Sequence, residues 1–204
     1  MMKDFSKLAS DEAITKVKDA LAKNGIEVLA VENGAQAREK VLEIIPEGAE
    51  VMTMTSETSR VTGIAEQLNE SGKYNSVRKK FATMDRKTQG LEMQKLGAAP
   101  EWAVGSVHAV TEDGRVIVAS ATGSQLPGYA YGSSHVVWVV GAQKIVKDLD
   151  EGMKRVYEYV LPLENERAKK AYGQNSSLNK LLIFNKEGTP GRITMIIVKE
   201  KLGF

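Results

Sequence analysis

The stretch HVVWVVG, residues 135–141, decides the expected fold of this chain. It is an apolar run of β-branched and aromatic residues without polar alternation, which is typical of a strand buried on both faces of a parallel sheet. The closing stretch RITMIIV, residues 192–198, has the same character. Around them, helical and strand patterns alternate, which predicts an α/β fold with a central, mostly parallel sheet flanked by helices. We expect a single domain over residues 1–204 because no linker, repeat or low-complexity segment interrupts this pattern.

Helix signals separate the predicted strands. Ser10 can cap a first helix that ends near residues 24–25, and Asn33 can cap a second helix that stops at Pro46. A third helix is predicted to open at residues 55–59, with an inner face made of Val61, Ile64, Ala65 and Leu68. Residues 74–100 are predicted to be partly helical. A long helix is predicted after Asp148; it ends or kinks at Pro162, and its inward side chains are Leu149, Met153, Val156 and Val160.

Residues 105–120, GSVHAVTEDGRVIVAS, predict a β-hairpin beside the central sheet. Two β-branched runs flank Asp113 and Gly114, and an Asp-Gly pair between such runs is typical of a type I′ turn. Further strands are predicted at residues 26–31, 50–54 and 180–184, the last joined to residues 192–198 by a turn.

Composition narrows the classes of function. The chain has no cysteine, which excludes disulfides, zinc-thiolate sites and an iron–sulfur cluster held by this chain itself. Its 28 basic and 26 acidic residues are interspersed, so no basic stripe predicts nucleic-acid binding. The apolar runs are far shorter than the roughly 20 residues of a membrane span, and no secretory signal pattern is visible. We therefore expect a cytoplasmic protein that binds neither nucleic acid nor membrane, and no clustered His, Asp or Glu set predicts a metal site.

Three polar loops follow predicted strands, at the edge of the sheet where α/β proteins usually bind ligands. They are TSETS at residues 55–59, ATGSQ at residues 121–125 and GAQK at residues 141–144. Backbone N–H groups at helix starts, hydroxyls and one lysine together predict an anion site in a crevice between these loops. The candidate ligand-binding residues are Thr55, Ser56, Thr58, Ser59, Thr122, Gly123, Ser124, Gln125, Gln143 and Lys144, and Glu57 is the candidate base or nucleophile.

Each part of this site has a structural alternative. The 55–59 loop can be a helix cap followed by a glutamate that the helix dipole favours, and the 121–125 loop can be a turn with positive φ at Gly123. Lys144 can be a solvated residue near a helix start. The loop at residues 173–180 would lie at the opposite edge if the strand after it runs parallel to its neighbours. The residues expected to be packed rather than functional are His108, His135, Trp102 and Trp138.

The run AVTEDGRVIVASATGSQLPGYAYGSSHVVWVVGAQKIVKDLDEGMKRVYEYVLPLENER, residues 109–167, resembles the LUD domain family, named for proteins of lactate utilisation, as does the closing GRITMIIVKEKLGF. The resemblance implies a fold similar to the sugar-phosphate isomerase and CoA-transferase superfamily. It also implies a role beside iron–sulfur partners in the oxidation of lactate to pyruvate. Many members have Asn before AITEDG, a DGTGNR loop and GxNK. The matching positions here are His108, residues 120–125, and Gln143 with Lys144, so the Asp, Asn and Arg of that loop are missing.

Two functions of different class remain. The preferred one is a non-catalytic subunit that binds a small anionic metabolite, an organic acid, and docks onto an oxidoreductase whose iron–sulfur cluster lies on the partner. It is preferred because Glu57 is the only carboxylate among the three loops, and acid–base chemistry commonly uses two titratable groups. The alternative is a small enzyme acting on an anionic carboxylate, a CoA thioester or a sugar phosphate, with Lys144 steadying the anion. A homodimer is a possible assembly.

Overall fold

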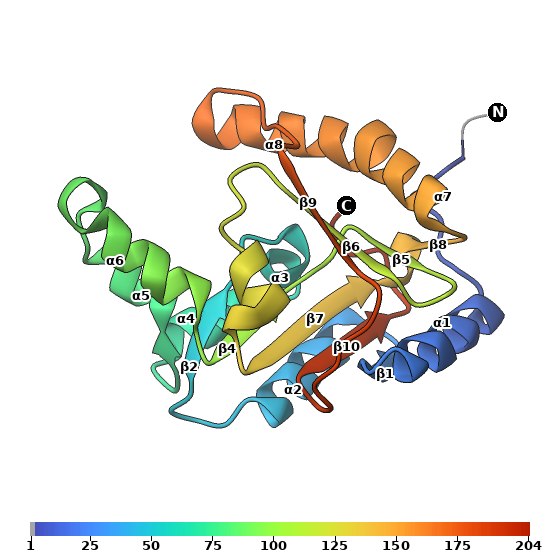
Figure 1. Cartoon of the computed structure of the whole chain (residues 1–204), viewed down its shortest axis with the longest axis horizontal. Helices are drawn as coiled ribbons and strands as arrows, with labels where there is room; N and C mark the ends of the chain where they lie inside the picture. Colours follow the sequence, from blue (N-terminus) through green and yellow to red (C-terminus); the bar gives the residue numbers. More distant parts are fainter. Residues whose placement is uncertain (1–2) are drawn as a thin grey trace.

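A six-stranded parallel sheet lies at the centre of the computed structural model, which describes residues 3–204 (Figure 1). The order across this sheet is β1 (Glu27–Val31), β10 (Ile193–Val198), β7 (His135–Gly141), β4 (Trp102–Gly105), β2 (Glu50–Thr53) and β3 (Asn75–Ser76). Each of its strand pairings is parallel. The predicted α/β fold with a central, mostly parallel sheet is therefore confirmed.

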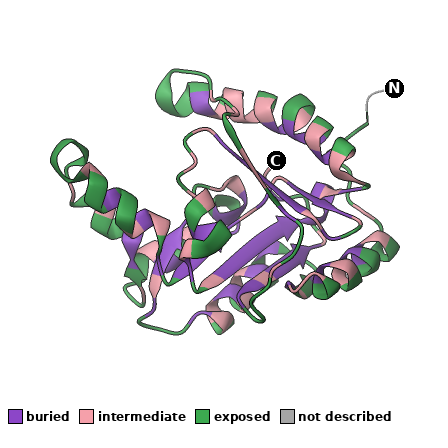
Figure 2. Cartoon of the chain, in the orientation of Figure 1, coloured by how far each residue is buried: buried purple, intermediate pink, exposed green. Residues whose placement is uncertain are grey.

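Strand β7 shows why an uninterrupted apolar run belongs at the centre of such a sheet. Successive side chains of a strand point to opposite faces. Val136 and Trp138 lie in one buried cluster, whereas Val137 and Val139 lie in another. Both faces of the strand are buried in this way, and Figure 2 shows the burial running through the whole centre of the sheet.

Helices cover both faces of the parallel sheet, as predicted. On one face, Leu21 of the first helix packs in the cluster of Trp138, and on the other face Val41 and Leu68 pack in the cluster of Val139. The helices are α1 (Asp11–Lys23), α2 (Gly34–Ile44), α3 (Glu57–Val61), α4 (Ile64–Glu70), α5 (Val77–Ala82), α6 (Arg86–Ala98), η1 (Gly128–Gly132), η2 (Ala142–Lys144), α7 (Leu149–Lys154), η3 (Arg155–Val160) and α8 (Leu161–Tyr172).

A second, mixed sheet contains the predicted hairpin. Its order is β8 (Ile145–Val146), β5 (Ala109–Thr111), β6 (Val116–Ser120) and β9 (Lys180–Phe184). Strands β6 and β9 are antiparallel, and β5 pairs with β8 in parallel. The hairpin is thus the middle of a four-stranded sheet rather than an addition to the central one. The two C-terminal strands, β9 and β10, consequently belong to different sheets.

The turn of this hairpin differs from the predicted type I′ geometry. A type I′ turn needs positive φ at both central residues. Gly114 has a φ of +82°, but no residue other than glycine has positive φ in the described part of the chain, so Asp113 does not meet the requirement. The Gly114 N–H donates to the Thr111 carbonyl at 2.9 Å, which closes a tight turn before the left-handed glycine.

Two helical predictions are also wrong in detail. The helix that opens after residues 55–56 breaks at Gly63, which has a φ of +71°, and this break leaves Val61 49% exposed instead of on the buried face. Pro162 does not end the long helix. The π-helical segment η3 precedes it and the backbone stays helical through Leu161, because wider turns accommodate a residue that lacks an N–H donor.

Residues 74–100 are partly helical, as expected, and form α5 and α6, which extend to one side of the molecule (Figure 1). Among residues 3–204, every helix is too short or too polar to cross a bilayer. The expected burial of Trp102 and Trp138 is confirmed, since their exposed fractions are 7% and 0%.

Candidate functional site

A cavity of about 220 Å³ lies where the polar loops meet. It is bounded by the segments that follow β2, β4, β6 and β7, and by η3, α8 and the loop after α8. Of the predicted site residues, those that line it are Thr55, Ser56, Glu57, Thr58, Thr122, Ser124, Gln125 and Lys144. The structure therefore brings all three predicted loops to one cavity, although Ser59, Gly123 and Gln143 do not reach its wall.

The segment after β2 has the properties of a capped helix start. The Ser56 hydroxyl accepts a hydrogen bond from the Ser59 N–H at 3.3 Å. Glu57 forms an ion pair with Arg60, whose Nε lies 2.9 Å from Oε2, and this contact lowers the pKa of the Glu57 carboxyl. A carboxylate with a lowered pKa is a weaker base, so this geometry works against Glu57 in that role. Ser59 is fully buried.

The segment after β6 is a turn with exposed hydroxyls. The Gly123 N–H donates to the Ser120 hydroxyl at 2.9 Å, and the φ of Gly123 is +87°, as the structural alternative predicted. The Gln125 amide is held by the Ala119 carbonyl at 3.2 Å. This turn leaves Thr122 and its neighbour Ser124 exposed on the cavity wall.

Lys144 is buried, which corrects the expectation of a mobile or solvated cation. Its exposed fraction is 3%, and its Nζ contacts Thr58 Oγ1 at 3.2 Å, Ser106 Oγ at 3.1 Å and the Val107 carbonyl at 3.1 Å. Burial, and then the nearby guanidinium of Arg155, lowers the pKa of Lys144 well below its ordinary value.

Gln143 has a structural role instead of facing the cavity. Its amide nitrogen donates to the Leu202 carbonyl at 2.9 Å, and its amide oxygen accepts from the Leu202 N–H at 3.4 Å. These bonds hold the segment that follows β10 against η2. The side chain is 2% exposed, so its polar atoms are satisfied within the protein.

Arg155, at the start of η3, is a buried cation that sequence patterns did not single out. It is fully buried, and its Nη1 donates to the His108 carbonyl, next to the carbonyl that Lys144 contacts. Its Nε and Nη2 have no hydrogen-bond partner, and its guanidinium lies 5.3 Å from the ring centroid of Tyr159. Burial lowers the pKa of Arg155 to about 10, so the group remains charged at neutral pH.

The basic side chains of Lys144 and Arg155 lack an acidic partner. Within residues 3–204, neither Lys144 nor Arg155 forms an ion pair with a carboxylate. Buried charges in proteins are normally paired, because an isolated charge in a medium of low dielectric constant is destabilising by several kcal/mol or more. Arg155, which stays charged at neutral pH, therefore makes the interior behind His108 electropositive.

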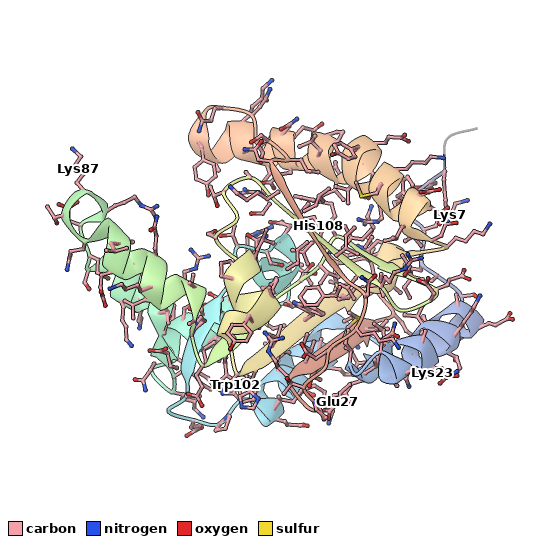
Figure 3. The ribbon with its side chains drawn as sticks, in the orientation of Figure 1. Lys7, Lys23, Glu27, Lys87, Trp102 and His108 are labelled. Carbon is pink, nitrogen blue, oxygen red and sulfur yellow. The ribbon has the colours of Figure 1, made fainter. Side chains whose placement is uncertain are left out.

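His108 lines the cavity as well as being packed, and it lies near the middle of the molecule in Figure 3. Its Nδ1 accepts a hydrogen bond from the Ala119 N–H at 3.0 Å, so a neutral ring carries its proton on Nε2. Burial first, and then the charges of Lys144 and Arg155, lowers the pKa of His108 to about 3. The imidazole is thus neutral at physiological pH. His108 follows the end of β4 by three residues, and the carboxyl end of β4 adjoins those of β2 and β7. This position in the sequence could have indicated that His108 belongs to the site.

A second carboxylate and a third cation come from α8. Glu164 and Arg167 both line the cavity and form a bidentate ion pair, with both N···O distances at 2.7 Å. This pair raises the pKa of Arg167. Glu57 is the only carboxylate of the three loops, but α8 brings a second carboxylate to the cavity. An i, i+3 pair on a helix surface gives no sequence signal of which way the helix faces.

The loop at residues 173–180 also reaches the cavity, through Ser176, Ser177 and Leu178. The expectation that it would lie at the opposite edge rested on a parallel strand after it. Strand β9 is antiparallel to β6, so the loop that enters β9 lies beside the end at which β6 leaves its sheet.

Known proteins share the sequence pattern and the fold of this chain. Residues 14–203 match the LUD domain family. The chain belongs to the LUD domain family. A crystal structure of a DUF162 family protein from Deinococcus radiodurans has a similar fold, with a TM-score of 0.57 and 13% sequence identity over 94% of this chain and 99% of that chain. No curated protein matches the sequence.

In this LUD domain, two of the departures from the family pattern, His108 and the 120–125 turn, lie on the cavity wall, whereas Gln143 does not. His108 stands at the position matched to an asparagine, and an amide oxygen could accept the same Ala119 N–H bond that Nδ1 accepts. The 120–125 turn lacks the acidic and basic residues of the family pattern, but α8 supplies Glu164 and Arg167 to the same cavity. In the described part of this LUD domain, no three metal-ligating side chains come together.

Proposed function

We propose that this LUD domain binds a small organic anion in the cavity and acts as an organic-acid-binding subunit in lactate utilisation, beside an oxidoreductase that carries the iron–sulfur cluster. The observation that carries the proposal is Arg155, a fully buried guanidinium without a carboxylate partner and with two unbonded nitrogens, which donates to the carbonyl of the cavity-lining residue His108. An anion in the cavity would compensate this charge through the protein interior behind His108, where screening by water is weak.

The cavity offers an anion several donors besides this charge. Arg167 and the Nζ of Lys144 line the wall, together with the hydroxyls of Thr122 and Ser124. Two carboxylates, Glu57 and Glu164, lie there too, but each is engaged by its own arginine. At about 220 Å³ the space suits a small metabolite, because drug-sized ligands use pockets of about 300–1,000 Å³.

The link to lactate utilisation rests on family membership, and the place of the cluster on a partner rests on the absence of cysteine. The genes that flank this one test the link. Neighbouring genes for cluster-binding lactate-oxidation proteins support the subunit function, whereas a neighbourhood of sugar metabolism contradicts it.

A second candidate function is a small enzyme acting on a carboxylate, a CoA thioester or a sugar phosphate. The presence of Glu164 favours it, because the cavity then holds two carboxylates together with the neutral His108. Product formation from any of these substrate classes, lost in Glu164→Gln but kept in the exposed control Glu166→Gln, would establish it.

Thermal denaturation with a panel of lactate, pyruvate, phosphate and sugar phosphates tests anion binding. A ligand at about 100 times its dissociation constant stabilises the folded state by roughly 2.7 kcal/mol, or about 5–10 °C in Tm for a domain of this size. We expect at least one carboxylate to produce such a shift, and the shift to shrink in Lys144→Met. Lys147→Met is the matched control, since Lys147 is exposed and close in sequence. If no ligand moves the Tm, or if Lys144→Met responds like the parent, the proposal is wrong.

A further inference from the structure

The surroundings of Lys144 are those of a reactive amine rather than a structural ammonium ion. The side chain is buried yet lines the cavity, and its Nζ contacts two hydroxyls and one carbonyl. Structural lysines in protein interiors are usually paired with a carboxylate, whereas Lys144 has no such partner within residues 3–204.

The hydrogen bonds around Nζ can be completed by a neutral amine, which has two N–H donors and one lone pair. The Val107 carbonyl can only accept, and the Thr58 hydroxyl also accepts because it donates to the Leu202 carbonyl at 3.1 Å. The Ser106 hydroxyl has one other polar contact, at 3.5 Å, so it is free to donate to the lone pair. Burial and the charge of Arg155 both lower the pKa of Lys144, which favours this neutral form.

We propose that Lys144 forms a reversible imine with the carbonyl carbon of a 2-oxo acid bound in the cavity. This inference rests on the proposed function, because the carboxylate of the 2-oxo acid is the anion that the cavity holds. The chemistry also separates two related ligands, since a 2-hydroxy acid such as lactate has a carboxylate but no carbonyl to react.

The step needs no oxidant, reductant or cofactor. The lone pair of Nζ attacks C2 of the 2-oxo acid, and the carbonyl π electrons move to the oxygen, which takes up a proton to give a carbinolamine. Nitrogen loses one proton, the hydroxyl takes up a second proton and leaves as water, and a protonated imine forms, so one proton is drawn from solvent overall. The Ser106 hydroxyl touches Nζ and lies on the cavity wall, so it is placed to relay these protons.

Reductive trapping tests the inference on the whole chain. Pyruvate and cyanoborohydride should produce one reduced adduct per chain, and peptide mapping should place it on Lys144. Lactate should give no adduct and should suppress trapping by pyruvate. Lys144→Arg keeps a cation but has no primary amine, so it should lose the adduct, whereas the exposed control Lys147→Arg should behave like the parent.

The Ser106→Ala variant tests proton transfer by the Ser106 hydroxyl separately from anion binding. It should slow trapping on the order of 10²-fold, the usual contribution of a positioned proton-transfer group, while the thermal shift by lactate persists. Even if Lys144→Arg does not fold, the Ser106→Ala variant and peptide mapping of the adduct in the parent protein test imine formation at Lys144.

The outcomes distinguish this inference from the proposed function. If pyruvate raises the Tm but no adduct maps to Lys144, imine formation is wrong and anion binding stands. If neither a shift nor an adduct is seen, both are wrong. Adducts spread over exposed lysines at the rate of Lys144 would also overturn the inference.

Discussion

Replacing Arg155 by methionine should leave the protein as stable as the parent or make it more stable, although the side chain is fully buried. Two of its nitrogens lack partners, and each such buried group is destabilising by about 1–3 kcal/mol. Against this, Arg155→Met loses one charged hydrogen bond, about 1.5–3 kcal/mol, and a cation–π contact with Tyr159, about 0.5–2 kcal/mol. The terms nearly cancel, with a net gain for the variant of at most about 1 kcal/mol.

Arg192 is the matched control, because it is equally buried but fully partnered. It pairs with Glu187 at 2.6 Å and donates to the carbonyls of Ser133, Gly128 and Tyr129. Removing one member of a buried pair typically destabilises by about 3–5 kcal/mol. The two variants should therefore differ by at least about 3 kcal/mol, or roughly 6–12 °C in Tm.

Thermal and urea denaturation of the two arginine variants measures this difference directly. Arg155→Met should also lose the thermal shift caused by organic acids, whereas phosphate and carboxylates should still stabilise the parent. If Arg155→Met is destabilised as strongly as Arg192→Met, the guanidinium is a structural group. The reasoning that an uncompensated charge behind His108 attracts an anion to the cavity is then refuted.

Three further predictions concern single side chains at the site. The Glu57→Gln variant should keep the fold, because losing the exposed ion pair with Arg60 lowers the free energy of unfolding by less than about 1 kcal/mol. Calorimetry should show an altered ligand affinity. An unfolded variant would show that Glu57 is structural. The pKa of His108 is lowered from 6.5 in the unfolded chain to about 3 in the folded chain. Between these two pH values the unfolded chain binds a proton that the folded chain does not, so stability falls as the pH falls. Relative to His108→Asn, the parent should therefore lose about 3 kcal/mol by roughly pH 4 in urea titrations, and parallel curves would contradict this. In Gly105→Ala the new Cβ would lie 2.1 Å from the Tyr129 hydroxyl, so the Tm should fall by an amount corresponding to about 1–3 kcal/mol, and adding Tyr129→Phe should restore part of it.

The turn residues show where local sequence is an incomplete guide. Asp113 and Gly114 were correctly placed between two strands, but the choice between turn types depends on how the two strands twist and pair. Gly63 shows the same limit for a helix, because this left-handed residue rotates the segment after it relative to the segment before it, so exposed Val61 no longer shares a face with buried Ile64. A pattern of apolar spacing assumes an unbroken helix, so it cannot register such a rotation.

The sequence by itself determined the α/β class, the buried strands such as residues 135–141, and the polar loops that meet at one cavity. These follow from short-range rules, since side-chain periodicity reports burial and parallel strands bring their carboxyl ends to one edge. Only the tertiary structure decided that Lys144 is buried and that Arg155 lacks a partner. It also decided that Glu164 and Arg167 face the cavity, because the direction of β9 and the rotation of α8 are set by packing between segments far apart in the chain. Burial and pairing are properties of that packing, and they govern the charge of each group more strongly than its residue type does.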